Sequence, residues 1–511
     1  MMHLKKDDVY ALIQKGERLH VECKEAFSVL PDTLWETYSS FANTDGGVVL
    51  LGIKELSDHS LSVQGVKNPD ALIKSFWDVI NNGEKVSLNV LDWRGVYSVD
   101  CDGKAVIVID VPRADRHDRP VFIGHDVFEG SYRRNGEGDY KMKRESVETM
   151  IRDKCTVSAD ACVLDEVGID ELNLDTIHRY RSRFASIKKG HAWNTLPDDE
   201  FLAKIGAAKR IRGMIHPTLA GLISFGDFNA ITDVVPHFFL DYRERLSDET
   251  RWSDRVCAHD ATWSGNIYDF FFKLYDKIVS DVKMPFKMGA DGISAEEETD
   301  VHRSVRELVA NALIHADYHG HQGIVIEKRF RELTFANPGT FLISKEDAIA
   351  GGNSEPRNEK IFNIFALVKI GERSGSGLSD LYGQWEKYGF PVPVIEEKYD
   401  PDRTIVRVSV DPESAQKWPK DGLAAVWNQT IDPKLTQKQT KTDPEIIRNL
   451  SASTRQVYMS LRENPDMTLR GLSSKLGFSK STVTTAIGTL VTLGLLRRVG
   501  PKKGGHWEIK V

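Results

Sequence analysis

The stretch of residues 306–317 limits what the 511-residue chain can fold into more than any other stretch. Apolar side chains recur at helical spacing from Val305 to Leu313, which predicts a helix with one buried face. Glu307, Asn311 and His315 follow one another at intervals of four residues, so they share a second face of that helix. Such a stripe of acid, amide and imidazole is unusual on a plain surface helix. The alternative is a helix whose Glu and Asn merely cap or pair locally.

Two strands and two glycine-containing loops follow this helix. Residues 324–328 and 333–337 have the composition of strands, and the first loop begins directly after the second strand. The second loop, residues 371–379, precedes a further helix. Glycines let a backbone approach a ligand closely, and the N-terminus of a helix presents free N–H groups to a phosphate. The alternative for each loop is an ordinary glycine-rich turn.

The order of helix, strand, glycine loop, lid, glycine loop and helix resembles that of the GHKL ATPases, the fold of gyrase-type, Hsp90-type and MutL-type proteins and of histidine kinases. The resemblance implies an ATP-binding α/β sandwich over residues 291–410, with Asn311 as a ligand of Mg²⁺, Glu307 as a candidate base and His315 near the phosphates. It also implies that Asn337 replaces an Asp that accepts a hydrogen bond from the adenine amino group. The residues expected to hold the nucleotide are Asn311, His315, Asn337, Gly339, Gly371, Gly375 and Gly377.

A second set of motifs lies near the N-terminus. Glu17, Glu22 and Lys24 form the pattern E-x-x-x-x-E-x-K, and a strand there would turn Glu22 and Lys24 to one face. The pattern F-A-N-T-D-G-G follows and leads into a buried strand, and the pattern Y-R-R-N-G begins at Tyr132. Together these motifs resemble the AlbA-like domain of Schlafen proteins and their bacterial relatives. The resemblance implies an α+β module over residues 1–155.

Three functions are compatible with the residues of this module. In Schlafen nucleases two glutamates and a further acid hold metal ions for phosphodiester cleavage. Here that implies Glu17, Glu22 and Glu55 as ligands of Mg²⁺ or Mn²⁺, although Lys54 occupies the usual position of the third acid, with Lys24 on the phosphate. The second function is nucleic-acid binding without cleavage, through Lys24, Arg113, Arg116, Arg133 and Arg134. The third is a structural ion pair between Glu22 and Lys24.

The last part of the chain is expected to be a tether and a basic domain. Residues 411–451 are polar, and residues 452–511 follow the order of two helices, a turn, a third helix and a β-hairpin. This order resembles the winged helix-turn-helix family. The domain has ten Lys and Arg against three Asp and Glu, a net +7 in a chain whose total charge is −7. We expect contacts to nucleic acid from Lys480, Arg497, Arg498, Lys502 and Lys503. Protein docking by the same fold is the alternative.

Composition narrows the class of protein further. Hydrophobic residues make up 41% of the chain and charged residues 28%, as in soluble globular proteins. No apolar run approaches ~18 residues, and residues 1–8 carry charges, so we expect a cytoplasmic protein without membrane contact. The five cysteines show no C-x-x-C spacing, which argues against zinc fingers and disulfide frameworks. Residues 156–290 contain no chemical motif and are expected to form a connecting scaffold.

The sequence therefore predicts a multidomain α/β protein. Our leading interpretation is an ATP-responsive nucleic-acid-binding regulator, for example of transcription, that binds DNA, RNA or both and forms homo-oligomers. The rival interpretation is a nucleotide-gated, metal-dependent nuclease, with antiviral defence as one role. Whether the chain hydrolyses ATP stays open. No P-loop motif G-x-x-x-x-G-K-[ST] occurs in the sequence, which excludes a helicase motor of that type.

Overall fold

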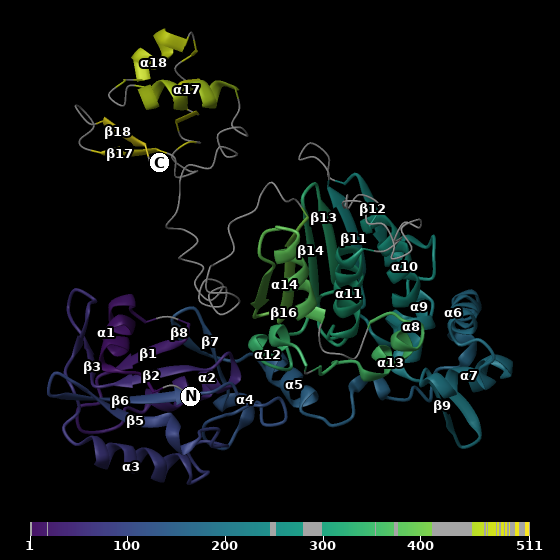
Figure 1. The fold of residues 1–511 in the computed structure, drawn as a ribbon, viewed down its shortest axis with the longest axis horizontal. Coiled ribbons are helices and arrows are strands. Elements are labelled where there is room, and N and C mark those ends of the chain that lie inside the picture. Colours follow the sequence, from purple (N-terminus) through teal and green to yellow (C-terminus); the bar gives the residue numbers. More distant parts are fainter. Residues whose placement is uncertain are drawn as a thin grey trace. The chain divides into compact units, whose positions relative to one another are not determined.

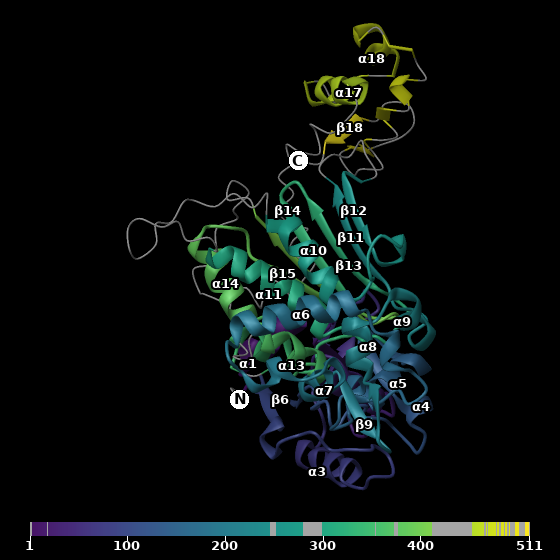
Figure 2. The same ribbon diagram turned by 90° about the vertical axis from the view of Figure 1, so that its right-hand side faces the viewer.

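The computed structural model of the chain divides into two units, Met1–Trp418 and Pro419–Val511. Figures 1 and 2 show their elements in two perpendicular views. The described positions are residues 3–17, 19–245, 252–279, 299–352, 354–371, 377–410, 452–463, 467, 469–476, 478–479, 482–484, 486–487, 490, 496–499 and 506–509.

The N-terminal part of the first unit is built on a four-stranded sheet in the order β1-β2-β6-β5, in which only the pair β1–β2 is parallel. Successive residues of β6 alternate between two apolar clusters, so both faces of the sheet are covered. Helices α2 and α3 cover one face, where Ile107 and Ile109 pack, and α1 covers the other. The bounds are α1 Lys6–Lys15, β1 Val21–Lys24, α2 Thr33–Asn43, β2 Gly47–Leu51, α3 Pro69–Ile80, β5 Val96–Cys101 and β6 Lys104–Val111.

Two hairpins and two helices complete this part of the unit. The hairpin β7–β8 packs on α2, and the last helix leads into the middle of the chain. The bounds are β3 Ile53–Glu55, β4 Leu61–Val63, α4 Val127–Gly130, β7 Tyr132–Asn135, β8 Gly138–Lys141 and α5 Arg144–Asp153. The strands expected at Glu22 and after the pattern F-A-N-T-D-G-G are confirmed as β1 and β2.

The middle of the chain is mostly helical. Its apolar residues Ile177, Tyr180 and Phe184 recur at helical spacing and are buried, as the sequence predicts. The bounds are α6 Leu174–Ile187, α7 Asp198–Ile205, β9 Ala208–Ile211, β10 Met214–Pro217, α8 Leu219–Phe225, α9 Phe228–Val234 and α10 Ile267–Val279.

A six-stranded sheet in the order β12-β11-β13-β14-β16-β15 forms the second half of the unit. Its pair β11–β13 is parallel and its other pairs are antiparallel. The bounds are β11 Leu240–Arg245, β12 Asp254–Cys257, β13 Ile324–Arg329, β14 Glu332–Pro338, β15 Val394–Lys398 and β16 Arg403–Ser409. The first two strands precede residue 290, so the sheet crosses the boundary that we drew there between the scaffold and the next domain.

Helices pack against this sheet and against one another. Helix α11 contacts β14, α10, α13 and α14, so it lies at the centre of the helical layer that packs on this sheet (Figure 2). Its residues Val305, Val309 and Leu313 are fully buried, because they fall on one side of the helix. The bounds are α11 Asp300–Ile314, α12 Lys345–Ala350, α13 Glu359–Leu367 and α14 Gly377–Lys387. The mixed α/β, multidomain architecture expected from the sequence is confirmed.

The second unit has its own apolar core, formed by Val457, Tyr458, Leu461, Leu472, Val483, Ala486, Ile487, Leu490 and Leu496. Two helices, helical residues between positions 482 and 490, and an antiparallel hairpin follow one another in the expected order. The bounds are α17 Ala452–Glu463, α18 Leu469–Leu476, β17 Leu496–Val499 and β18 His506–Ile509. Assignment to the winged-helix family stays a prediction. The expected tether, residues 411–451, lies outside the described residues.

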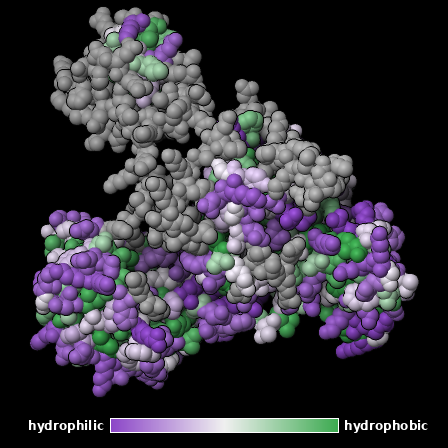
Figure 3. Space-filling model, viewed as in Figure 1, coloured by the Kyte–Doolittle hydropathy of each residue, from purple (hydrophilic) through white to green (hydrophobic). Residues whose placement is uncertain are grey.

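The described surface is mostly polar in the view of Figure 3. Figure 3 shows hydrophilic residues over most of the coloured surface in that view, with hydrophobic ones scattered among them. Within the described part of the chain, no helix combines the length and the apolar character that crossing a bilayer requires.

Candidate functional site

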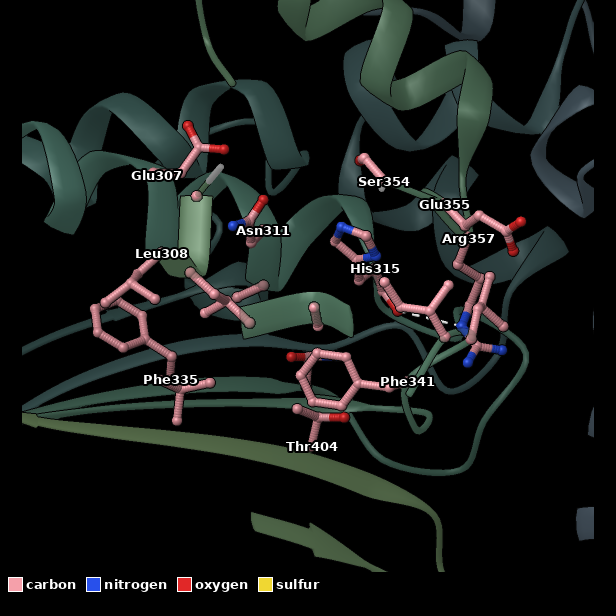
Figure 4. Close-up of a pocket in the computed structure, with 18 of the residues that line it drawn as sticks. Glu307, Leu308, Asn311, His315, Phe335, Phe341, Ser354, Glu355, Arg357 and Thr404 are labelled. Atoms are coloured by element: carbon pink, nitrogen blue, oxygen red, sulfur yellow. Dashed lines mark hydrogen bonds between the residues drawn. The ribbon is translucent and has the colours of Figure 1, made fainter. Parts of the chain in front are cut away.

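A pocket lies where α11 faces the six-stranded sheet, and its empty volume is about 1000 Å³, including the open mouth. Its walls come from α11, β14, β16, the first residues of α14 and the segment that joins β14 to α13 (Figure 4). This segment, residues 340–352 and 354–357, is called the wall segment below. Apolar side chains together with a few convergent polar ones line the pocket, as is typical of small-molecule sites.

The structure brings the whole polar stripe of the helix to this pocket. Glu307, Asn311 and His315 line it from successive turns of α11. Figure 4 shows the three side chains in that order along the helix. The spacing of the residues therefore predicted which side chains meet, and their chemical roles stay predictions.

The glycine at the start of α14 is pressed against two members of the stripe. A Cβ atom built on Gly377 would lie 3.0 Å from Cγ of Glu307 and 3.2 Å from Nδ2 of Asn311. This approach is tighter than most Cβ atoms make, so glycine suits the position and lets the backbone at the start of α14 come close to both side chains. Gly371 has a φ of +76°, a conformation that favours glycine. Gly375 lies outside the described residues.

His315 is held as a neutral imidazole. Burial and the nearby Arg357 guanidinium lower the pKa of His315 to about 4, so the ring is uncharged at pH 7. Arg357 donates from Nε to the His315 carbonyl at 3.2 Å and from Nη2 to the Thr340 carbonyl at 2.6 Å, and it forms an ion pair with Asp153 of α5. Arg357 thus joins the end of α11, the wall segment and the N-terminal part of the unit. Nothing in its sequence surroundings marked it for this role.

The opposite wall combines two polar side chains with apolar ones. Asn337 on β14 and Thr404 on β16 are paired across the sheet. The amide nitrogen of Asn337 donates to the Pro338 carbonyl at 3.2 Å, and the Thr404 hydroxyl donates to the Gly339 carbonyl at 2.8 Å. Gly339 has a φ of +92° and leaves room for Arg357, whose guanidinium would lie 3.1 Å from a Cβ atom there. Sequence reasoning missed Thr404, although the alternation of residues 403–409 could have placed it on the face of Val406.

The carboxylates of the N-terminal module do not gather around one point. Glu22 forms ion pairs with Lys24 at 2.9 Å and with Arg134 at 2.9 Å. Glu17 accepts a bond from the Cys23 N–H group at 3.2 Å, and burial together with the Glu22 carboxylate raises the pKa of Glu17.

Glu55, the third predicted metal ligand, is exposed and pairs with His59. Among the described residues, Glu17, Glu22 and Glu55 do not form a group whose ligand atoms lie within 4.8 Å of one another. A cluster of that kind occurs at Cys257, His259 and Asp260, where Asp260 also accepts the Cys257 N–H bond at 3.1 Å. Local hydrogen bonding accounts for this cluster.

The residues predicted to contact nucleic acid fall into two groups. Arg133 and Arg134 are buried: Arg133 pairs with Asp402 at 2.5 Å, and Arg134 pairs with Glu22 and Asp139. Neither guanidinium is presented to solvent, so a direct contact with nucleic acid would require these pairs to open. In the second unit, Arg497 and Arg498 belong to β17, and Lys480, Lys502 and Lys503 lie outside the described residues.

Comparison with protein families supports two of the three domain types suggested by the sequence. Residues 17–143 match the family "Schlafen, AlbA_2", and residues 325–406 match the family "Putative ATP-dependent DNA helicase recG C-terminal", also called HATPase_c_4. Residues 148–241 match "Domain of unknown function (DUF8451)". The chain therefore contains a Schlafen AlbA_2 domain and a RecG C-terminal-like domain. Helix α11, which carries the polar stripe, precedes the second of these matches.

Solved structures give only distant similarity. The crystal structure of the DIP2311 protein from Corynebacterium diphtheriae is 16% identical, with a TM-score of 0.38, over 98% of both chains. The N-terminal domain of a "Putative ATP-dependent DNA Helicase RecG-related Protein" from Nitrosomonas europaea is 24% identical, with a TM-score of 0.21, over 27% of this chain and 89% of that one. Scores this low carry no conclusion. Among curated proteins, none matches the chain.

Proposed function

We propose that the chain is a nucleotide-responsive nucleic-acid-binding regulator whose pocket takes ATP together with a divalent cation, Mg²⁺ being the expected one. The observation that carries this proposal is the pocket itself, in which Glu307, Asn311 and His315 line one cavity beside a sheet. The matched families support it, because one is named for an ATP-dependent DNA helicase and the other for Schlafen AlbA_2. The pocket has the mixture of apolar surface and convergent polar groups that is typical of ligand sites.

The residues present fit a nucleotide and its cation. The amide oxygen of Asn311 and the carboxylate of Glu307 are hard oxygen donors, which suit Mg²⁺. Gly377 brings a helix N-terminus against both side chains, and backbone N–H groups at such a terminus attract phosphate. Phe335, Phe341 and Val406 provide apolar surface for a flat base.

Each side chain can be given a role on this basis. A bound divalent cation would supply charge neutralisation at the phosphates. Asn311 would hold that cation, and Glu307, one turn away, would orient a water molecule and accept its proton. His315 is neutral at pH 7 and offers one donor or one acceptor without adding charge. Asn337 and Thr404 would recognise the polar edge of the base.

Titration calorimetry of the full chain with ATP and Mg²⁺ tests the pocket. We expect Asn311→Ala to weaken binding at least about 10-fold, because it removes the proposed ligand of the cation. Asn229→Ala, on the exposed side of α9, is the matched control and should bind like the unchanged protein. Equal affinities in all three proteins would reject the site.

The second unit is the proposed nucleic-acid contact. Residues 452–511 have a net charge of +7, and β17 contains Arg497 and Arg498 at consecutive positions. A localised basic surface on an acidic body attracts a polyanion. The nuclease alternative has less support from geometry, because Glu22 is neutralised by Lys24 and Arg134 and Glu55 is paired at the surface.

A further inference from the structure

Three arginines of the N-terminal part reach the wall of the pocket from one loop. The loop, residues 112–119, follows β6 and is called the arginine loop below. Arg113 donates from Nη2 to the Phe341 carbonyl at 2.6 Å, and Arg119 donates from Nη2 to the Leu342 carbonyl at 2.9 Å. Arg116 donates from Nε to the Glu355 carboxylate at 2.5 Å. All three acceptors belong to residues that line the pocket.

A buried cluster of four charges reinforces the same contact. Asp45 and Glu397 alternate with Arg113 and Lys345, at separations of 2.9 to 3.7 Å. Glu397 also accepts the backbone N–H bond of Phe341 at 2.7 Å. Asp45 and Arg113 come from the N-terminal part, whereas Lys345 begins α12 in the wall segment. The cluster therefore joins the two parts of the unit at the pocket.

The positive charge of Arg119 has no carboxylate bonded to it among the described residues, whereas Arg113 and Arg116 each bond to a carboxylate. The Arg119 side chain is buried and it donates to a carbonyl rather than to a carboxylate. Its Nε, like that of Arg113, has no partner among the described atoms. Burial and the neighbouring Arg113 lower the pKa of Arg119 to about 9. A buried cation is unfavourable unless negative charge approaches it. A polyanion in the pocket, on the other side of Leu342, would supply that charge.

We propose that the N-terminal module is a positioning element of the nucleotide pocket, in which Arg113, Arg116 and Arg119 hold the wall segment and couple triphosphate binding to the module. This inference rests on the proposed function. The arginines do not line the pocket, so they act through Phe341, Leu342 and Glu355 rather than by touching the ligand. Coupling of this kind is reciprocal: if the module holds the pocket in its binding form, an occupied pocket must in turn stabilise the arginine loop.

Affinity measurements on the full chain test the first half of the proposal. We expect Arg119→Met to weaken binding of ATP about 10-fold and to weaken binding of uncharged adenosine less, because only the triphosphate carries the compensating charge. Arg144→Met is the matched control, since Arg144 is an exposed arginine of the same module that pairs with Glu148 and stacks on the Phe128 ring, away from the pocket residues.

A second pair of variants avoids the risk that Arg119→Met fails to fold. Arg116→Gln and Glu355→Gln should each weaken ATP binding. The double variant should bind no more weakly than Arg116→Gln, because that substitution already removes the bond to Glu355, together with the bonds from Arg116 to the Asp153 and Cys155 carbonyls.

Hydrogen exchange tests the second half of the proposal, that an occupied pocket stabilises the arginine loop. The N–H groups of Ala114 and Arg119 are bonded to the carbonyls of Ala42 and Asp115, so their exchange reports opening of the arginine loop. Added ATP should slow exchange in this loop and leave α3 unchanged, and it should have no effect in Asn311→Ala. If the unchanged protein binds no ATP, the proposed function itself fails. If it binds ATP through Asn311 while the arginine variants bind equally well and exchange in the loop is constant, only the present inference is overturned.

Discussion

Gly377 is the position where one added carbon should do most harm to the pocket. A Cβ atom there would lie 3.0 Å from Glu307 and 3.2 Å from Asn311, closer than such atoms normally approach. We expect Gly377→Ala to weaken ATP binding about 10-fold or more, as measured by calorimetry, because the side chains that hold the cation must move.

The same helix supplies a control for that substitution. Gly383 lies in the interior of α14, and a Cβ atom there would meet nothing within 4 Å. Gly383→Ala should leave affinity unchanged and raise stability by about 0.5–1 kcal/mol, because alanine is the better helix former. Equal affinities in Gly377→Ala and Gly383→Ala would contradict the close approach.

His315 predicts a dependence of stability on pH. Its pKa is about 4 in the folded protein and near ~6.5 in an unfolded chain, so the unfolded state binds a proton first as the pH falls. The neutral ring therefore makes its full contribution to the free energy of unfolding above pH ~6.5. This contribution, on the order of 2–3 kcal/mol, is lost as the pH falls from ~6.5 to about 4. Denaturant titrations of His315→Gln should show that the free energy of unfolding falls less over this pH range than it does in the unchanged protein. His125→Gln, at an exposed position, should follow the unchanged protein.

Glu22 on β1 leads to a prediction that distinguishes nucleic-acid binding from nucleic-acid cleavage. Because Glu22 is engaged by Lys24 and Arg134, we expect no cleavage of labelled RNA or DNA by the full chain with either Mg²⁺ or Mn²⁺. Cleavage that disappears in Glu22→Gln would restore the nuclease interpretation.

The ion pairs of Glu22 should be visible in stability instead. Glu22 pairs with Lys24 and with the buried Arg134, which keeps Asp139 as a second partner, so Glu22→Gln should lower the free energy of unfolding by about 1–3 kcal/mol. Glu129→Gln removes a carboxylate from the exposed pair with Lys141 and should change stability little. Equal effects of the two substitutions would show that Glu22 is not held as described.

Elements with a strong local pattern could be predicted, and contacts between distant segments could not. The stripe of α11 and the strands β13 and β14 follow from spacing within short stretches, whereas the helix expected after residue 379 begins earlier, at Gly377. The pairing of β11 with β13 could not be foreseen, because more than 80 residues separate their starts and nothing in the sequence of either strand identifies its partner.

Contacts between distant segments also decide the surroundings of the arginines of the N-terminal module, which the sequence does not reveal. Arg113, Arg116 and Arg133 were grouped as a surface for nucleic acid because basic and aromatic residues interleave there. The structure turns them toward Phe341, Glu355 and Asp402, which lie more than 200 residues further along the chain. A sequence shows that a charge is present, but not whether another segment neutralises it.

For the whole molecule, the uneven charge predicts how nucleic-acid binding responds to salt. The logarithm of the association constant of the full chain for duplex DNA should fall linearly with the logarithm of salt concentration, because phosphates that the protein neutralises release their counterions. Replacing both Arg497 and Arg498 by Ala should reduce that slope by about 2 at most, because each arginine neutralises about one phosphate. Replacing Arg94, which is exposed in the first unit, is the control. An unchanged slope in the double variant would exclude β17 from the interface.

The position of β16 has a consequence for how the protein is made. This strand, residues 403–409, lies between β14 and β15 and contributes Thr404 and Val406 to the pocket. A ribosome therefore releases α11 nearly a hundred residues before the floor of the cavity can exist. During that interval the apolar side of the nascent helix has no finished sheet to cover it, which makes this stage of synthesis the one at which assistance from a chaperone would matter most.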